Sequence, residues 1–460
     1  MSKQSPWTWI PTLYVAEGLP YFAVNTLTVL MYVNLGVSLS EMAFFTGWLY
    51  LPWVIKPFWS PFVDLIRTKR WWIIAMQAML ALTMAAVGFL LPTSFFFSAT
   101  LVCFWLMAFC SATNDIASDG YYMLELQPHE QAAFVGIRST FYRIASVIGQ
   151  GGLVMLAGVL EAGMDSVPAA WSTVFIILSL FFLGITLYHV RFLPHAPLDR
   201  PRADLRASDI MRDFGHTFVT FFRKPHVVSA LAFMLLYRLP EAMCIKLVQP
   251  FLVASRESGG LGLTTAQVGF VNGTVGVVAL LAGGILGGLA IARNGLKRWL
   301  WPMALALTLP CAFYCLLAMT QPEDFAWICT AVGIEQFGYG FGFISFMLYL
   351  IYFARGESAT SHYAFCTAFM ALGMMLPGMA AGWIHEQLSA FSLFGLDGPQ
   401  GYVNFFWWVM VCCLATFAVT LTVKVDPAFG RKNAPGGMGT DAPVGMGRDA
   451  INRVHSDKNK

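Results

Sequence analysis

Ten ionisable side chains stand inside long apolar stretches of the chain, where charge is costly and is usually retained for a function. Half of them are acids and half are bases. This balance suits an internally paired, water-accessible cavity, because an unpaired charge in hydrocarbon costs several kcal/mol. Such groups can bind polar or anionic molecules and can carry protons. The acids are Glu17, Asp115, Asp119, Glu241 and Glu335, and the bases are Lys56, Arg138, Arg143, Arg238 and Lys246.

Asp115 and Asp119 are four residues apart, so both project from one face of a helix. Two carboxylates this close repel each other when both are ionised, so one of them is expected to hold a proton. A carboxyl group that gains and loses a proton is what proton-coupled transport needs. The alternative is structural: each carboxylate pairs with Arg138 or Arg143 on the next helix and locks the bundle.

Two further carboxyl groups are candidates for proton coupling. Glu335 stands alone in the middle of its apolar stretch and therefore needs a partner across a cavity. Glu17 precedes the segment GLPY, whose proline interrupts the hydrogen-bond ladder of a helix. Interrupted helices expose backbone groups that can bind substrate. We therefore expect proton coupling at Asp115, Asp119, Glu335 and Glu17.

The remaining bases and their aromatic neighbours are candidates for substrate binding. Arg238 and Glu241 are three residues apart and can pair along one helix. Lys246 lies deeper in the same stretch and is the better candidate for holding an anionic group, although basic side chains also reach out to membrane interfaces. Lys56, near the end of its stretch, is expected to be structural or interfacial. The expected substrate-binding residues are Arg138, Arg143, Lys246, Arg238, Glu241, Tyr121 and Tyr142.

The composition requires a membrane around these groups. Hydrophobic residues make up 57% of the 460 residues and charged residues 12%, and the mean hydropathy is +0.64. Soluble domains carry about 25% charged residues, so lipid must solvate most of this surface. Apolar stretches of ~20 residues or more can cross a bilayer. They predict an all-α polytopic membrane protein with spans at 8–32, 42–63, 71–91, 95–124, 132–160, 170–192, 226–254, 265–292, 298–319, 324–353, 360–386 and 402–424.

Basic residues gather in every second connection between the predicted spans, and acidic residues gather in the others. Since short cytoplasmic loops are enriched in Lys and Arg, both termini are predicted to lie in the cytoplasm. The long basic connection divides the chain into an N-terminal six-helix half (1–195), an inter-half loop (196–225) and a C-terminal six-helix half (226–424). The polar tail (425–460) is rich in Gly and Pro and is predicted to be disordered.

A basic turn occurs twice in the chain. VDLIRTKRWW follows the second predicted span and IARNGLKRWL follows the eighth, and their Lys-Arg pairs are 228 residues apart, from 69 to 297. This spacing is close to half the chain and indicates a transporter built from two six-helix halves. The turns also resemble the basic loop motif of the major facilitator superfamily. That resemblance implies a gating role for Asp64, Arg67, Arg70, Arg293 and Arg298, although Ser60 stands where the motif has glycine.

Longer blocks resemble the AmpG-type muropeptide permeases of the major facilitator superfamily, a group that also includes acetyl-CoA carriers. The blocks include EGLPYFAVNTLTVL, NDIASDGYYMLEL, GIRSTFYRIASVIGQGG and EQFGYGFGFIS. The resemblance implies a twelve-helix major-facilitator fold and proton-driven import of anhydromuropeptides, such as GlcNAc–anhydroMurNAc, for cell-wall recycling. It also places Asp115, Asp119, Arg138, Arg143 and Glu335 at motif positions of the group.

Departures from the group's pattern leave the ligand open. His362 stands where the group has glutamine, and Gly120 stands where it has alanine. The alternative is a permease of the same superfamily for another sugar derivative, a siderophore or a CoA ester. An alternative from another class is a membrane acyltransferase, but the chain shows no His-x4-Asp pair or nucleophile elbow at a membrane interface, so we expect no enzymatic activity.

The expected partners follow from the same reading. The nine cysteines show no CxxC or Cys/His spacing, so no metal site or disulfide framework is expected. No cofactor is expected, since the proton motive force supplies the energy. We expect a glycan or glycopeptide substrate, the lipid of a bacterial inner membrane, no nucleic acid, and a monomer.

Overall fold

The computed structural model describes residues 5–126, 128–195, 199, 207–355, 359–392, 400–427 and 429–430. For some residues within helices, Asp64 among them, only the backbone is described. The prediction made for the tail falls largely on residues 431–460, outside the described part. Every regular element that the structure describes is helical, which confirms the all-α prediction.

The N-terminal half places its helices one after another with short turns between them. Its elements are η1 (Pro6–Thr8), α1 (Ile10–Phe22), η2 (Ala23–Leu27), α2 (Thr28–Asn34), α3 (Leu39–Trp48), α4 (Leu51–Ile66), α5 (Lys69–Leu90), α6 (Phe96–Glu125), α7 (Pro128–Ser146), η3 (Val147–Gly152), α8 (Leu153–Gly163) and α9 (Val167–Phe192). Ser38, Thr68 and Ser166 accept a hydrogen bond from the backbone N–H three residues further on. These caps satisfy donors that the first turns of α3, α5 and α9 leave free.

The second part of the chain repeats this pattern after one additional helix. Thr264 and Gln267 form a reciprocal capping box at the start of the eighth predicted span. The elements are α10 (Ala207–Phe222), α11 (Val227–Leu236), α12 (Leu239–Val253), η4 (Arg256–Ser258), α13 (Thr265–Phe270), η5 (Val271–Gly276), α14 (Val277–Asn294), α15 (Leu296–Thr308), η6 (Leu309–Cys311), α16 (Ala312–Thr320), α17 (Phe325–Ala354), α18 (Ala359–Ser389) and α19 (Gly401–Thr422).

Within the described residues, ten helical stretches are long and apolar enough to cross a membrane. They correspond to the third to twelfth predicted spans. Two further helical stretches, 10–34 and 39–66, correspond to the first two predicted spans, and the turn at 49–50 divides the second of them. The helices are therefore consistent with the twelve predicted spans, and their ends differ from the predicted ends by a few residues.

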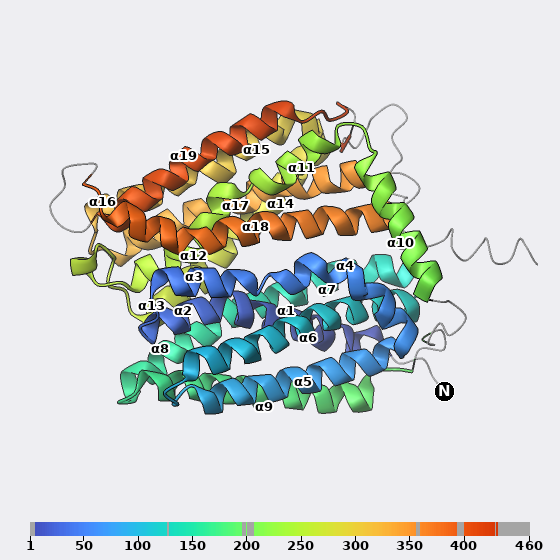
Figure 1. The fold of residues 1–460 in the computed structure, drawn as a ribbon, viewed down its shortest axis with the longest axis horizontal. Helices are drawn as coiled ribbons and strands as arrows, with labels where there is room; N and C mark the ends of the chain where they lie inside the picture. The colour runs from blue at the N-terminus through green and yellow to red at the C-terminus, as the bar shows by residue number, and fades with distance from the viewer. Residues whose placement is uncertain are drawn as a thin grey trace, which may run out of the picture.

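The two halves lie side by side along the long axis of the molecule (Figure 1). Helices α1–α9 form one layer and α11–α19 form the other, while α10 lies across one end of both layers (Figure 1). The connection predicted as an inter-half loop therefore contains a helix. Phe221 of α10 is fully buried, with its ring 5.7 Å from Phe353 and 5.5 Å from Phe365. These contacts fix α10 to the C-terminal half.

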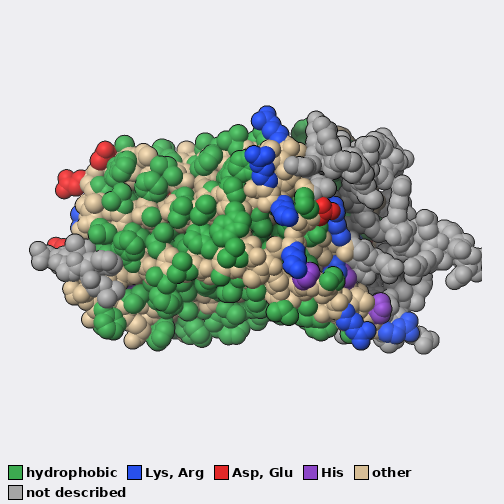
Figure 2. Space-filling model, turned by 90° about the horizontal axis from the view of Figure 1, so that it is seen from above, with side chains coloured by type: hydrophobic (Ala, Val, Ile, Leu, Met, Phe, Trp, Pro, Cys, Tyr) green, Lys and Arg blue, Asp and Glu red, His purple; other side chains and the backbone are tan. Residues whose placement is uncertain are grey.

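Side-chain chemistry changes along the long axis. Figure 2 shows hydrophobic side chains over the middle of the molecule, most of the visible Lys and Arg toward the end at which α10 lies, and most of the visible Asp and Glu at the opposite end. We call these the basic end and the acidic end. An apolar belt of this kind suits lipid contact. The basic end is the end that the sequence predicts to face the cytoplasm.

Candidate functional site

A cavity of about 510 Å³ lies between the two halves. Its volume falls within the ~300–1,000 Å³ typical of small-molecule sites. Helices α1, α4 and α7 line it from the N-terminal half, and α12, α17 and α18 line it from the C-terminal half. Its wall combines aromatic rings, amides and charged groups. Five of the ten ionisable residues singled out above line it: Lys56, Arg143, Arg238, Glu241 and Glu335.

Two ion pairs join α4, α6 and α7 beside the cavity. Lys56 Nζ lies 2.5 Å from Asp115 Oδ2, and Arg138 Nη2 lies 3.0 Å from Asp119 Oδ1. The Tyr14 hydroxyl donates to the same Asp119 oxygen at 3.2 Å, and the Arg138 guanidinium lies 4.8 Å from the Tyr14 ring centre. The structural alternative offered from the sequence is therefore half right. Asp119 pairs with Arg138 as that alternative predicts, but Asp115 pairs with Lys56. Lys56 was expected to be structural or interfacial.

Glu17 adds a third carboxyl group to this cluster. Glu17 is 8% exposed, and its carboxyl group interacts electrostatically with Asp115, Asp119 and Arg138. Its Oε2 atom is buried without a hydrogen-bond partner among the described residues. The cluster thus contains two bases and three acids and has an excess of one negative charge when all five groups are ionised. A single proton makes it neutral.

A third ion pair lies in the C-terminal half. Arg238 Nε donates to Glu241 Oε2 at 2.8 Å, and Arg238 Nη2 donates to Glu241 Oε1 at 2.5 Å. The two side chains are only 10% and 7% exposed, and Nη2 also donates to the Tyr339 hydroxyl at 3.1 Å. The guanidinium lies 4.8 Å from the Phe343 ring centre. Pairing along one helix, expected from the spacing, is observed, and it leaves this part of the wall neutral.

Glu335 has neutral partners instead of a cation. Its Oε2 atom accepts hydrogen bonds from the Tyr314 hydroxyl at 2.9 Å and from Gln336 Nε2 at 2.8 Å. The residue is 6% exposed, and no ion pair to a described residue forms. The partners are a phenol from the preceding helix α16 and the neighbouring amide, both in the same half, so the expected partner from across the cavity is not found among the described residues. This leaves a buried carboxyl group whose charge no described cation balances.

Arg143 is the complementary case, an uncompensated cation in the cavity wall. Its side chain is exposed and makes no hydrogen bond or ion pair with any described residue. The neighbouring Tyr142 also lines the cavity. Arg138 and Arg143 are five residues apart, which turns their side chains about 140° from each other around α7. One therefore faces Asp119, and the other is free to meet a ligand.

Three residues expected to bind substrate lie away from the cavity lining. Lys246 is 1% exposed, and its Nζ donates to Thr46 Oγ1 of α3 at 3.1 Å, across the boundary between the halves. Tyr121 is fully buried, and its hydroxyl donates to the Pro194 carbonyl at 2.6 Å. Arg138, paired with Asp119, also lies outside the lining. The geometry does not support these three as cavity ligands.

The first basic turn is tied to its own half. The Arg70 guanidinium donates to the carbonyls of Val190 and Leu193 at the end of α9, at 2.7 and 2.9 Å. Asp199 accepts from the backbone N–H groups of Lys69 and Arg70 at 2.7 and 2.9 Å and so caps α5. Of the other residues named for gating, Arg67, Arg293 and Arg298 are exposed at the basic end, and the side chain of Asp64 lies outside the described residues.

At the acidic end, the two halves are in direct contact. Glu161 of α8 accepts from Thr265 Oγ1 at 2.5 Å and from Asn34 Nδ2 at 2.8 Å, and Asn34 also donates to Thr265 at 2.9 Å. Ser40 N donates to Glu386 Oε1 at 3.1 Å. Asn34, Ser40 and Glu161 belong to the N-terminal half, and Thr265 and Glu386 belong to the C-terminal half. These hydrogen bonds therefore join the halves at the acidic end. None of these residues was predicted from the sequence to join the two halves.

The chain is similar to proteins of known family. A model of the Major Facilitator Superfamily matches residues 12–377. An anhydromuropeptide permease of Escherichia coli is 28% identical over 396 residues, covering 83% of this chain and 75% of the relative. A putative transporter AmpG 4 of Rickettsia conorii is 23% identical over 373 residues, covering 78% and 85%.

Solved structures share the fold. A D-xylose–proton symporter superposes with a TM-score of 0.67 at 12% identity and covers 91% of this chain and 99% of that one. The nucleoside transporter NupG superposes with a TM-score of 0.66 at 15% identity and covers 89% and 98%. These similarities confirm the resemblance read from the sequence blocks, and they are similarities to permeases and transporters rather than to enzymes.

Proposed function

Since the chain belongs to the major facilitator superfamily and is therefore a multi-pass membrane transporter of small molecules, we propose that it imports anhydromuropeptides together with protons. The proposed substrates are GlcNAc–anhydroMurNAc and its peptide-bearing forms. The similarity to the E. coli anhydromuropeptide permease supports this substrate class. The proposed setting is a bacterial inner membrane, with the basic end and both termini in the cytoplasm and the protein acting as a monomer.

The observation that carries the proposal is the pair of uncompensated charges in the cavity wall. Arg143 has no described anionic partner, and Glu335 has only neutral donors around it. An anhydromuropeptide combines sugar rings with at least one carboxylate, so its anionic group can take Arg143 as a counter-ion. Glu335 can bind a proton, which neutralises its carboxylate. Loading substrate and proton together leaves the cavity without an unbalanced charge.

Glu17 offers a second place for a proton. The cluster of Lys56, Asp115, Asp119, Arg138 and Glu17 is one negative charge in excess when ionised, as described above. A carrier that exposes its cavity alternately to the two sides of a membrane moves such charges through low-dielectric surroundings. Neutralising the cluster before this movement lowers its cost. We therefore assign proton carriage to Glu335 and Glu17, with Asp115 and Asp119 held by their bases.

In the proposal, the inward proton gradient sets the direction of transport, and the structure corresponds to one state of the cycle. The hydrogen bonds between Glu161 and Thr265 and between Ser40 and Glu386 close the acidic end, which the proposal places outside the cytoplasm. In the proposed cycle, this arrangement is the inward-facing state. Opening the acidic end requires these bonds to break, which makes the inter-half contacts there the outer gate of the proposed cycle.

Uptake in cells tests the proposal. A strain that lacks its own muropeptide permease is given labelled GlcNAc–anhydroMurNAc, with and without this chain. We expect the chain to restore uptake and a protonophore to abolish the restored part. Glu323→Gln, which changes an exposed carboxylate outside the cavity, serves as the control and should transport like the parent. Absence of uptake would contradict the substrate, and uptake indifferent to the protonophore would contradict proton coupling.

A further inference from the structure

Within the described part of the chain, three membrane-spanning helices contain a π-helical turn, and each of these turns carries an amide side chain. The turns are η2, η3 and η5. Their amides are Asn25, Gln150 and Asn272, and all three line the cavity. A π turn inserts one residue into an α-helix and redirects the side chains next to it, and such turns occur frequently at functional sites. No ionisable residue lies in these turns.

The three turns meet where the halves meet. η3 packs against η2 within the N-terminal half and against η5 of the C-terminal half. The contact between η3 and η5 is so close that a Cβ atom added to Gly273 would overlap the Cα atom of Gly151. Only glycine fits this approach. The amides therefore belong to one layer that crosses the boundary between the halves.

Buried amide atoms in this layer have no partner. Asn25 Oδ1 and Asn272 Nδ2 are buried without a hydrogen bond to any described residue, and so is Oε1 of Gln249, which lines the same cavity from α12. The other ends of two amides are held: Asn25 Nδ2 donates to the Tyr21 carbonyl at 3.0 Å, and Gln150 Nε2 donates to Ser146 at 2.8 Å. Buried polar atoms are almost always hydrogen-bonded, so these amide atoms keep a hydrogen-bonding capacity that a polar group in the cavity, from water or from a ligand, can use.

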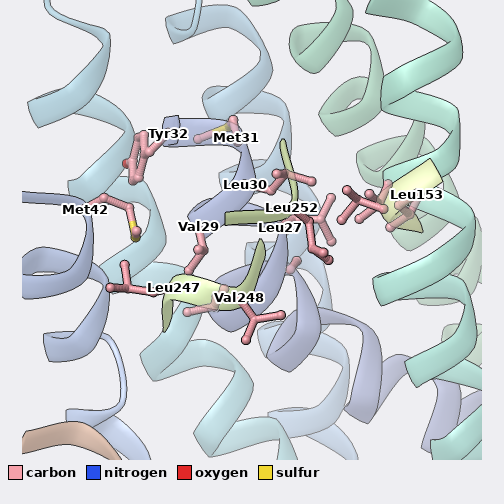
Figure 3. Close-up of a cluster of buried hydrophobic side chains, with 14 of the residues drawn as sticks. Leu27, Val29, Leu30, Met31, Tyr32, Met42, Leu153, Leu247, Val248 and Leu252 are labelled. Atoms are coloured by element: carbon pink, nitrogen blue, oxygen red, sulfur yellow. The ribbon is translucent and has the colours of Figure 1, made fainter. Parts of the chain in front are cut away.

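Apolar side chains seal the layer on the side of the closed end. Leu27 is the last residue of η2, and Leu153 directly follows η3. Figure 3 shows Leu27 and Leu30 beside Leu252 of α12, with Leu153 close by, and all four are buried. Hydrogen bonds formed next to such a seal are shielded from water and are correspondingly stronger.

We propose that Asn25, Gln249 and Asn272 form a neutral subsite that binds the hydroxyl and acetamido groups of a sugar ring, apart from Arg143, which holds the carboxylate. This inference rests on the proposed function and deepens it. Uncharged amides offer both a donor and acceptors and suit an uncharged polar ligand better than an ion. Tyr21 and Trp53, whose rings lie 5.2 Å apart, line the same cavity and can cover the apolar face of a sugar.

The test compares two ligands on three variants of the purified full-length protein. The ligands are GlcNAc–anhydroMurNAc and the analogue in which its carboxylate is converted to a carboxamide. Asn272→Leu and Gln249→Leu should weaken the binding of both ligands by the same factor, about 3- to 10-fold for one neutral hydrogen bond. Arg143→Gln should weaken only the carboxylate form. Gln387→Leu, which changes an exposed amide of α18, is the matched control and should bind both ligands like the parent.

Each result decides one of the two proposals. Unchanged affinity in Asn272→Leu and Gln249→Leu, with binding by the parent intact, would overturn the neutral subsite alone. A loss confined to the carboxylate form in these variants would overturn it too. If the parent binds neither ligand, the proposed substrate class is wrong and the subsite falls with it. Size-exclusion profiles check folding, and Asn272→Ser, which also lacks the amide, replaces Asn272→Leu if the leucine variant does not fold.

Discussion

Replacing Glu335 by glutamine should separate binding from proton coupling. The carboxyl oxygen of Glu335 accepts from Tyr314 at 2.9 Å and from Gln336 at 2.8 Å. An amide oxygen can accept both bonds, and no ion pair is lost because none forms with a described residue. We therefore expect Glu335→Gln to fold and to bind substrate. An amide cannot take up or release a proton, so this variant carries one proton fewer in each cycle.

The size of the effect follows from the number of protons. A pH difference of one unit is worth about 1.4 kcal/mol per proton, which allows about tenfold accumulation for each proton carried with the substrate. The assay is uptake of labelled GlcNAc–anhydroMurNAc into proteoliposomes with a pH difference of one unit. The membrane potential is held at zero with potassium and valinomycin, so that the charge of the substrate does not contribute. Glu335→Gln should lower the final accumulation ratio about tenfold.

Exchange of labelled for unlabelled substrate, which needs no net proton movement, should survive in Glu335→Gln. The control is Glu323→Gln, the same chemical change at an exposed position of the same half. It should accumulate substrate like the parent. If Glu335→Gln reaches the accumulation ratio of the parent, Glu335 carries no proton, and the reading of this site as a proton carrier is refuted.

Three further substitutions test other parts of the site. Arg143→Gln should lower the affinity for anionic substrate about 10- to 100-fold, as expected for one charge-assisted hydrogen bond. Binding titrations at two salt concentrations would show the loss, and an affinity equal to that of the parent would contradict the role of Arg143 in binding the carboxylate. Glu241→Gln should cost about 3–5 kcal/mol of stability because it leaves the buried Arg238 unpaired. The double variant that also carries Arg238→Met should recover much of that stability in thermal unfolding. No recovery would contradict the view that the unpaired Arg238 charge causes the loss. Gly273→Val should abolish uptake because its side chain cannot fit against η3, whereas Gly288→Val, where a Cβ meets nothing within 4 Å, should transport normally.

The helical framework could be predicted because lipid imposes a simple rule on the sequence. Each span needs ~20 apolar residues, so the stretch predicted at 8–32 appears as the helical stretch 10–34, and that at 402–424 appears as α19. The rule does not specify interruptions within a span. The turn at 49–50 and the π turn η2 are changes of backbone geometry within apolar sequence, so hydropathy does not register them.

Part of the site could have been placed more accurately from helix periodicity. Arg238, Glu241, Ile245 and Gln249 fall three or four residues apart and all line the cavity. Lys246 is one residue away from Ile245, about 100° around α12, and therefore leaves this stripe. Its depth in the apolar stretch made it attractive as a ligand, but direction around the helix decides which side chains face a cavity.

Other features depend on distant parts of the chain and leave no local signal. Lys56 and Asp115 are 59 residues apart and meet because α4 packs against α6. The contacts of Glu161 with Asn34 and Thr265 span 127 and 104 residues. Local patterns indicate which groups are buried, but the partner of each group is set by the packing of the helices.

Proton-coupled import can be measured as proton movement driven by substrate. Proteoliposomes that contain the purified chain are placed in a weakly buffered medium with a pH indicator, and GlcNAc–anhydroMurNAc is added outside. We expect the medium to become more alkaline as labelled disaccharide enters, and an unrelated disaccharide such as cellobiose to have no effect. Entry of labelled GlcNAc–anhydroMurNAc without any change in external pH would contradict proton-coupled import.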